Sequence, residues 1–240
     1  MKKILKKIAR RLPFALTKNI RYDQLTKDVI RKCCKKDTNC IDVGCHKGEI
    51  LEMMLEAAPE GKHYGFEPIP ELYGFLKEKF KKTNCTISDI ALSDKTGIIN
   101  FNYVLSNPSY SGIKKRNYDR DNEKDMTIDV RTEKLDEVLD DNYQAGLLKI
   151  DVEGAELLVL KGAEKMITRC KPVIIFEFGL GASDVYETSP KELWNFFEEK
   201  NYRISLLDDW LRDKSYFSFE DLEEQYFHKI YHSFIAWPAA

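Results

Sequence analysis

Short apolar runs alternate with amphipathic helical stretches along most of the chain, and this alternation restricts the fold more than any other feature. Strands are predicted at 40–43, 62–67, 85–87, 97–104, 126–130, 146–152, 172–178, 202–207 and about 229–237. Helices are predicted at 22–34, 49–58, 70–81, 132–139, 155–167 and 190–200. Strands joined through helices make right-handed crossovers that place the helices on both faces of a mostly parallel sheet. The pattern therefore predicts an α/β fold.

The 240 residues are sufficient for one sizeable core and too few for two ordinary domains. Lys and Arg (38) nearly balance Asp and Glu (40), which argues against a nucleic-acid partner. The balance hides an asymmetry, because residues 1–36 carry 13 cations and only 2 acids. We predict a basic, helical N-terminal extension over 1–36 and one larger domain over 37–240.

The first twelve residues place apolar side chains on one helical stripe and Lys or Arg on the other face. No run reaches the ~18–20 apolar residues that a bilayer span needs. A segment of this kind suits weak, reversible binding to an anionic membrane. It also suits docking on residues 37–240, where acids outnumber cations, or contact with a second subunit in a homodimer. The six cysteines lack metal-like spacing, so we expect reduced thiols in a cytoplasmic protein, with peripheral contact at the inner membrane face as a further option.

Residues 41–49 (IDVGCHKGE) join a buried strand to a helix through a turn with two glycines. Glycines let a ligand approach the backbone closely. In open α/β sheets, ligands bind at the carboxyl ends of the strands. The next strand ends in Glu67, 23 residues after Gly44, and an acid at this separation suits a pair of ribose hydroxyls. The motif predicts a ligand that contains a nucleoside.

Two residues of this turn argue against a dinucleotide. A pyrophosphate-binding fingerprint has the pattern Gly-x-Gly-x-x-Gly, and His46 occupies the third position of that pattern here. Asp42 directs a negative charge at the same turn. A carboxylate there opposes phosphate and favours a cation. S-adenosylmethionine has one ribose, an ammonium, a sulfonium and no phosphate, so it fits better than NAD.

Four segments resemble the FkbM family of class I S-adenosylmethionine-dependent methyltransferases. They are DVGCHKG at 42–48, GFEP at 65–68, ALSDKTG at 91–97 and LLKIDVEGAE at 147–156. The resemblance spans about 39–207 and implies a Rossmann-like fold with a seven-stranded sheet and an antiparallel last strand. It also implies O-methylation of sugars or natural products. Cys45 and His46 stand where the family often has alanine and asparagine.

The resemblance implies that Asp42, Gly44 and Gly48 contact the methionine part, Glu67 the ribose and Asp89 the adenine. The full set expected to bind the cofactor, or its product S-adenosylhomocysteine, comprises Asp42, Gly44, Cys45, His46, Gly48, Glu67, Pro68, Asp89, Ile90, Ala91 and Asp151. Each acid also has an ordinary structural interpretation. Asp42 would be a helix cap, Glu67 a surface charge at a strand end and Asp89 a turn former.

A second group of ionisable residues is expected to carry the chemistry. Lys149, Asp151 and Glu153 project to one face of a strand, and crowding there can raise a carboxylate pKa or lower that of the lysine. Our hypothesis is that Asp151 or Glu153 orients the acceptor and that one member of the cluster, which includes Glu156, takes its proton. The structural alternative is a Lys149–Glu153 salt bridge.

The acceptor is expected to contact the loop at 106–116 and an acid in an apolar strand. The residues assigned to it are Ser109, Tyr110, Ser111, Lys114 and Glu177. Hydroxyls, an aromatic ring and cations suit a sugar, a nucleotide-sugar or a phosphorylated sugar. The alternative is an ordinary solvated loop.

These patterns together predict an S-adenosylmethionine-dependent O-methyltransferase for a carbohydrate or glycan hydroxyl. The alternatives are a dinucleotide-dependent oxidoreductase and a cofactor-binding module without catalytic activity. His228 and His232 have metal-like spacing but no convincing third ligand, so no metal site is predicted and we interpret them as an ordinary pair.

Overall fold

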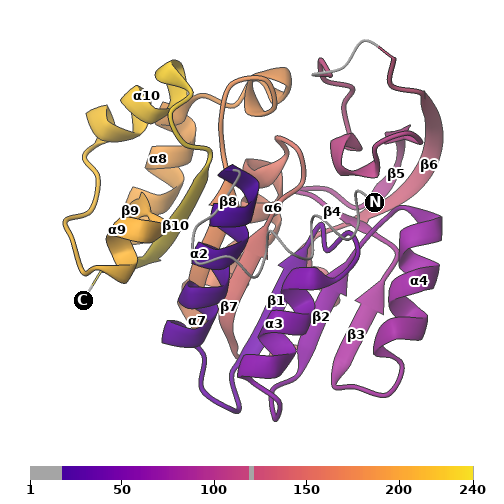
Figure 1. The fold of residues 1–240 in the computed structure, drawn as a ribbon, viewed down its shortest axis with the longest axis horizontal. Helices are drawn as coiled ribbons and strands as arrows, with labels where there is room; N and C mark the ends of the chain where they lie inside the picture. Colours follow the sequence, from indigo (N-terminus) through magenta and orange to yellow (C-terminus); the bar gives the residue numbers. More distant parts are fainter. Residues whose placement is uncertain (1–17, 119–121, 240) are drawn as a thin grey trace.

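The computed structural model describes residues 18–118 and 122–239 (Figure 1). The predictions for the apolar stripe at 1–12 therefore lie outside the described residues. Helix α2 (Lys18–Cys33) is the first described element, and its Val29 and Ile30 are fully buried. This helix packs on the same core as the sheet. The division of the chain after residue 36 stays a prediction.

A seven-stranded sheet forms the centre of the molecule, in the order β3-β2-β1-β7-β8-β10-β9. Its strands are β1 (Asn39–Val43), β2 (His63–Phe66), β3 (Cys85–Ser88), β7 (Ala145–Ile150), β8 (Val173–Glu177), β9 (Tyr202–Leu206) and β10 (Ser233–Pro238). Strands β1, β2, β3, β7 and β8 are parallel to one another, and β10 runs antiparallel to both β8 and β9. The α/β class and the antiparallel last strand are confirmed.

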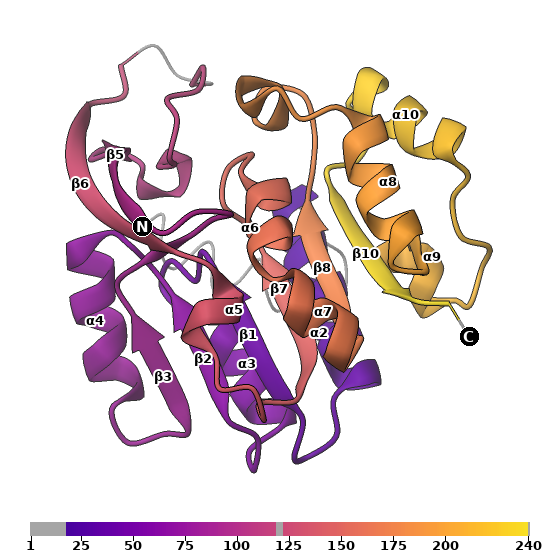
Figure 2. The same ribbon diagram turned by 180° about the vertical axis from the view of Figure 1, so that it is seen from behind.

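Helices cover both faces of the sheet, as predicted (Figures 1 and 2). Helices α2, α3 (Glu49–Ala57), α4 (Pro70–Phe80) and α9 (Leu207–Leu211) pack on one face around Leu51, Leu76 and Ile235. The helices on the other face are α5 (Leu135–Val138), α6 (Glu156–Gly162), α7 (Glu164–Cys170), α8 (Pro190–Glu199) and α10 (Phe219–His228). Neighbouring residues of β8 serve opposite faces, since Ile174 and Phe176 pack with the second group and Ile175 with the first. That alternation is the two-residue period of a strand buried on both sides.

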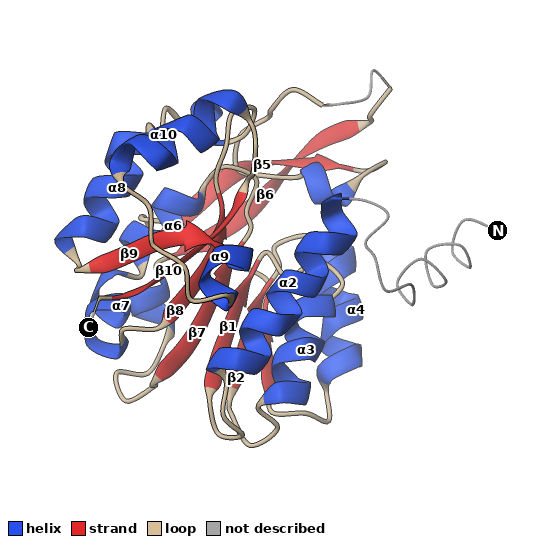
Figure 3. Cartoon of the chain, turned by 60° about the vertical axis from the view of Figure 1, so that its left-hand side comes forward, coloured by secondary structure: helices blue, strands red, loops and turns tan. Residues whose placement is uncertain are grey.

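A second, three-stranded sheet stands beside the upper end of the first (Figure 3). It contains β4 (Ala91–Leu92), β5 (Gly97–Val104) and β6 (Asp125–Glu133), in the order β4-β6-β5. Between β5 and β6 lie the short helix η1 (Pro108–Tyr110) and the loop expected to bind the acceptor. Another short helix, η2 (Ser183–Tyr186), follows β8. The sequence predicted two of these strands but not their separation into a sheet of their own.

Several predicted boundaries were wrong. The helix expected at 132–139 is only the single turn of α5, because β6 continues through Thr132 and Glu133. The helix expected at 155–167 is divided into α6 and α7 near Gly162, where an added Cβ would lie 2.0 Å from the Ser93 carbonyl oxygen. Residues 208–222, for which no helix or strand was predicted, contain most of α9 and the start of α10. The last strand begins at Ser233 rather than at 229.

Candidate active site

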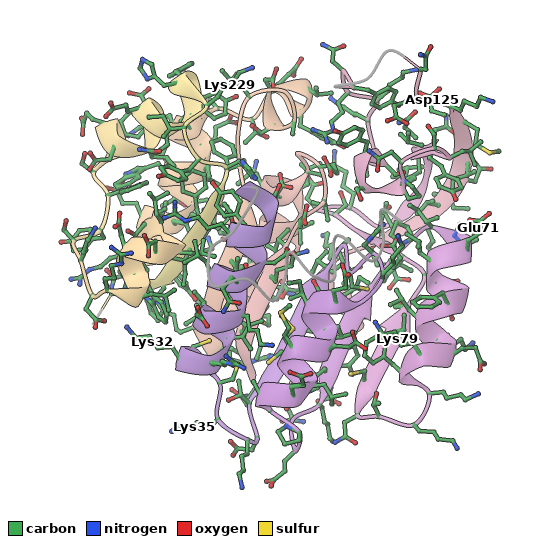
Figure 4. The ribbon with its side chains drawn as sticks, in the orientation of Figure 1. Lys32, Lys35, Glu71, Lys79, Asp125 and Lys229 are labelled. Carbon is green, nitrogen blue, oxygen red and sulfur yellow. The ribbon has the colours of Figure 1, made fainter. Side chains whose placement is uncertain are left out.

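A cavity of about 1110 Å³ opens at the carboxyl ends of β1, β2, β7 and β8. Further walls come from α2, the start of α3, the second sheet, the loop at 106–116, the residues after β8 and the segment before β10. In Figure 4, Lys229 and Asp125 mark this end of the molecule and Lys35 the opposite end. Ligand pockets typically measure ~300–1000 Å³, so this one has room for a nucleoside and a second small molecule together.

The turn after β1 depends on glycine at one position. Gly44 has φ +74, and a Cβ on it would lie 1.9 Å from the carbonyl oxygen of Asp151. The close approach joins the end of β1 to the end of β7, where the strand order reverses. His46, in the same turn, also has a positive φ and lines the cavity together with Cys45. Gly48 does not line it. A Cβ there would press on Phe80 and Leu76, so its smallness serves helix packing.

A buried ion triad joins these two strand ends. Asp42 of β1 is fully buried, and its Oδ1 lies 3.4 Å from Nζ of Lys149, its register partner on β7. The same Nζ lies 3.2 Å from Oδ2 of Asp151 and donates to the Gly44 carbonyl oxygen. Burial alone would lower the pKa of Lys149, but the charges of Asp151 and Asp42 outweigh it and raise that pKa. Lys149 therefore stays protonated. Of the two effects expected from crowding, a raised carboxylate pKa or a lowered lysine pKa, the structure shows the first, at Glu153 and Glu156.

Glu67 connects the ends of β1 and β2. Its Oε2 accepts the N–H of His46 at 2.8 Å, and its Oε1 accepts the N–H of Ile69 at 3.1 Å. Burial raises the pKa of Glu67 to about 7, against the lowering effect of these two N–H groups. Each oxygen can accept a further hydrogen bond, so the carboxylate can hold two ligand hydroxyls while the backbone fixes its position.

Glu153 pairs with a cation from the facing loop instead of with Lys149. Its Oε2 lies 2.5 Å from an Nη of Arg116, whose guanidinium lies 4.6 Å from the ring centre of Tyr110. The predicted alternative, a Lys149–Glu153 salt bridge, was wrong. The reason is that Glu153 has left the strand and adopts φ +58. Burial and the charge of Asp151 raise its pKa, and Arg116 only partly opposes them.

Glu156 holds the loop that follows β7 through hydrogen bonds to its backbone. Its Oε1 accepts the N–H groups of Val152 and Gly154, each at 3.1 Å, and its Oε2 has no hydrogen-bond partner among the described residues. Burial raises the pKa of Glu156 to about 7. The carboxyl group thus holds the segment that carries Asp151 and Glu153.

Glu177 ends β8 and faces the cavity, where 43% of its side chain is exposed. The surrounding walls still raise its pKa by burial, and the charges of Asp151 and Glu153 raise it further. Its Oε1 lies 3.9 Å from Nε2 of His232. The apolar strand β8 therefore ends in an acid whose side chain is exposed to the cavity.

Most of the residues predicted from the sequence lie in this cavity, but not all. Pro68, Ile90, Ala91, Ser109, Tyr110 and Ser111 also line it. Asp89 does not; it is exposed and lies 3.9 Å from Arg131 in the second sheet. Lys114 does not either, since its N–H donates to the Tyr186 hydroxyl and its Nζ to the Val185 carbonyl oxygen. Ser111 uses its hydroxyl oxygen to accept the N–H of Val104, which secures the loop.

The cavity also contains residues that were not assigned to it. Arg116, Tyr22, Asp23, Tyr231 and His232 line it from three separate segments. Arg116 carried a signal as one of three cations in the acceptor loop. His232 carried one through its spacing from His228, but the two were interpreted as an ordinary pair, and only His232 lines the cavity. The others reach the site through the packing of α2 and the pairing of β10 with β8, which no local pattern encodes.

Acids outnumber cations in the cavity. Its lining includes eight Asp or Glu residues and four Lys or Arg residues. Lys149 and Arg116 are already engaged with carboxylates. This acidic lining suits a positively charged ligand, which favours the ionised form of the carboxyl groups, and it opposes a phosphate. Among the described residues there is no cluster of three side chains arranged to hold a metal ion, and no described helix is long and apolar enough to cross a membrane.

Comparison with known proteins gives consistent matches. The family described as "Methyltransferase FkbM domain" matches residues 42–204. The chain is 26% identical over 194 residues to methyltransferase sdnD of Sordaria araneosa, an alignment that covers 65% of this chain and 74% of that protein. It also resembles the crystal structure of a methyltransferase FkbM from Methylobacillus flagellatus, with 16% identity and a TM-score of 0.54. That match covers 85% of this chain and 44% of the other, and supports the fold alone.

Proposed function

The chain belongs to the FkbM methyltransferase family, and on this premise we propose that it is an S-adenosylmethionine-dependent O-methyltransferase for a sugar-like hydroxyl. The observation that carries the proposal is the pair of carboxylates, Asp42 and Glu67, at neighbouring strand ends of one cavity. The family match supports methyl transfer, and the site supports the choice of donor.

The residues present fit this cofactor. Glu67 has hydrogen-bonding capacity left for the two ribose hydroxyls, and the apolar side chains of Ile90 and Ala91 offer a surface for the adenine. The acidic surplus suits a ligand with a sulfonium and an ammonium. A dinucleotide would bring two phosphates to the same surplus, so an oxidoreductase is disfavoured. When bound, the cofactor would supply a methyl group already activated by the positive charge on sulfur.

The protein's own contribution is to align the acceptor and stabilise the charges. Lys149 holds Asp42 and Asp151 in place, and Asp151 can direct the acceptor hydroxyl towards the methyl group. The Arg116–Glu153 pair fixes the loop that carries Ser109 and Tyr110 over the cavity. Alignment of this kind can be worth effective molarities of ~10⁵ M or more.

The acceptor is proposed to be a neutral sugar or similar polyol. Hydroxyl and carboxylate groups line its expected place, at Ser109, Tyr110 and Glu177. Lys114 points away, and Arg116 already pairs with Glu153. Without a free cation among these groups, a nucleotide-sugar or phosphorylated sugar is less well matched than an uncharged one.

Calorimetry and a turnover assay test the proposal. We expect S-adenosylhomocysteine to bind and NAD not to bind, and Glu67→Gln to weaken the binding. Glu71→Gln is the matched control, because Glu71 is exposed on α4 and does not line the cavity. Release of S-adenosylhomocysteine is then followed over a panel of neutral, phosphorylated and nucleotide sugars. Binding of NAD in place of S-adenosylhomocysteine would overturn the proposal.

A further inference from the structure

Transfer of a methyl group to a hydroxyl requires a group that accepts the proton. Most ionisable groups in the cavity are already engaged. Lys149 is held protonated between Asp42 and Asp151, and Glu153 is paired with Arg116. Glu67 and Glu156 each accept two backbone N–H groups. These contacts suit them to positioning rather than to proton transfer.

One pair has a different geometry. Nε2 of His232 lies 3.9 Å from Oε1 of Glu177, and both side chains are more than two-fifths exposed within the cavity. An imidazole beside a carboxylate is a common arrangement for general-base catalysis, because the carboxylate orients the ring and stabilises the imidazolium. The pair stands at the ends of two adjacent strands of the central sheet, next to the ion triad.

The surroundings fix the position of the His232 ring. Ser233 is the register partner of Glu177, and the His232 carbonyl oxygen accepts the N–H of Phe178 at 2.8 Å. The ring of Tyr22, from α2, lies 4.6 Å from the His232 ring, centre to centre. Three elements therefore confine the imidazole while leaving it accessible from the cavity.

We propose that His232 is the general base that accepts the proton of the acceptor hydroxyl, and that Glu177 is the positioning residue that orients it. The proposal rests on the proposed methyltransferase function and assigns its proton-transfer step. His232 lies beyond residues 42–204, the part that matches the family, so the family resemblance does not supply this assignment.

The step is balanced without a further reactant. The O–H bond of the acceptor breaks, and its electron pair supports the new bond between oxygen and the methyl carbon. The bond between that carbon and sulfur breaks, and its electron pair stays on sulfur, which becomes neutral. The proton moves to an imidazole nitrogen of His232. One positive charge thus passes from sulfur to the histidine ring.

The charges that face the ring favour this transfer. The titratable groups around it come from β8, α2, the loop after β7 and the segment of His232 itself. Those that line the same cavity are Glu177, Tyr22, Asp23, Asp151, Glu153, Lys229 and Tyr231, together with Lys149 of β7 and Glu156 of α6, whose charges also act on Glu177. Acids outnumber cations in this set, so an imidazolium beside Glu177 is stabilised. Burial, and then the charges of Asp151 and Glu153, raise the pKa of Glu177. A cation formed at His232 lowers that pKa again, so the carboxylate and the imidazolium stabilise each other as an ion pair.

The first experiment requires no turnover. Ring-proton NMR signals of the four histidines are followed across pH in the full chain with S-adenosylhomocysteine added. The His232→Gln variant identifies the signal of His232. We expect Glu177→Gln to move the midpoint of that signal to lower pH by roughly half a unit or more, because an anionic neighbour stabilises the protonated ring. The signal of His228 should not move.

The second experiment measures the rate of S-adenosylhomocysteine release with an acceptor that the wild-type chain methylates. We expect His232→Gln to lower kcat by roughly 10²–10⁴-fold and to abolish the rise of the rate with pH, while affinity for S-adenosylhomocysteine is retained. His228→Gln is the matched control. His228 ends α10, its ring contacts the Glu224 carbonyl oxygen, and it does not line the cavity.

The outcomes separate three claims: the role of His232, the role of Glu177 and the methyltransferase function itself. Full turnover by His232→Gln, or an unchanged pH profile, overturns the assignment while leaving the methyltransferase proposal intact. An unshifted His232 signal in Glu177→Gln overturns the role of Glu177. If the wild-type chain forms no S-adenosylhomocysteine with any acceptor of the panel, the proposed function itself fails, and this assignment fails with it.

Discussion

Replacing Lys149 with methionine should destabilise the fold strongly, because it leaves a buried carboxylate without its counter-charge. Asp42 is fully buried, and neither of its oxygens has a hydrogen-bond partner among the described side chains and backbone groups. Its nearest cation is Lys149 Nζ, at 3.4 Å. At that distance, an effective dielectric constant of ~20 gives an attraction of about 5 kcal/mol. Removal of one partner from a buried pair typically costs about 3–5 kcal/mol.

Urea unfolding at pH 7, followed by circular dichroism, measures this loss. We expect Lys149→Met to lower the free energy of unfolding by about 3–5 kcal/mol. Lys214→Met is the control, since Lys214 is 54% exposed and pairs with Asp209 at 2.8 Å on the surface. Its loss should be at most about 1 kcal/mol. The control separates the effect of a buried pair from that of removing any lysine.

A double variant tests the cause. Adding Asp42→Asn to Lys149→Met removes the unpaired charge, so the double variant should regain at least half of the loss. The reasoning is refuted if Lys149→Met costs less than about 1 kcal/mol, or if the double variant is no more stable than the single one.

Three further predictions follow from the same structure. The pKa values of Glu67 and Glu156, about 7 against an ordinary 4.5, mean that the folded chain keeps protons which the unfolded chain releases. Their contribution to stability is complete below about pH 4.5 and is lost as the pH rises through about 7. Glu67→Gln should therefore reduce the difference in unfolding free energy between pH 5 and pH 8 by up to about 3 kcal/mol, and an unchanged difference would contradict the assigned burial. Asp89→Ala should leave the affinity for S-adenosylhomocysteine within about twofold in calorimetry, since Asp89 is exposed outside the cavity; a large loss would restore its predicted role at the adenine. Gly44→Ala should cost about 2 kcal/mol or more in urea unfolding, because its Cβ would meet the Asp151 carbonyl oxygen at a positive φ. Gly74→Ala, where a Cβ meets no atom within 4 Å, should be neutral or stabilising, and equal effects of the two would be inconsistent with this explanation.

The strands and the glycine turn could be predicted because their signals are local. Residues 40–43 and 172–178 are apolar runs of strand length. The turn between β1 and α3 is indicated by its two glycines, Gly44 and Gly48. The helices missed after β9 are short and rich in charge. Helix α10 is nevertheless marked by a capping box at Ser218, whose hydroxyl accepts the N–H of Asp221. The spacing of Ser218 and Asp221 is therefore a local signal for the start of this helix.

For the site, local spacing predicts which residues stand at strand ends, but not which side chains they contact. Asp42, Glu67 and Asp151 follow strands, and parallel strands bring their carboxyl ends together, so these acids meet in one cavity. The partner of each acid depends on packing between distant segments. Glu153 pairs with Arg116 of a facing loop, and Lys149 with an acid 107 residues earlier on the neighbouring strand. No sequence pattern distinguishes these pairs from the Lys149–Glu153 bridge that spacing alone suggested.

The same limit explains the errors at Asp89 and Lys114. Asp89 precedes the short strand β4, and its direction is set by the second sheet, whose existence was not predicted. Lys114 is turned towards η2 by hydrogen bonds to Tyr186 and Val185, about seventy residues later. His232 enters the site because β10 pairs with β8. All three positions are decided by contacts that are remote in the sequence.

A crystal structure of the chain with S-adenosylhomocysteine would test the central claim most directly. We predict that the ribose hydroxyls lie within about 3 Å of the Glu67 carboxylate and that the sulfur faces the part of the cavity lined by Asp151, Glu177 and His232. A ribose bound elsewhere, with Glu67 contacting only the backbone N–H groups of His46 and Ile69, would contradict the assignment of this cavity as the methyl-donor site.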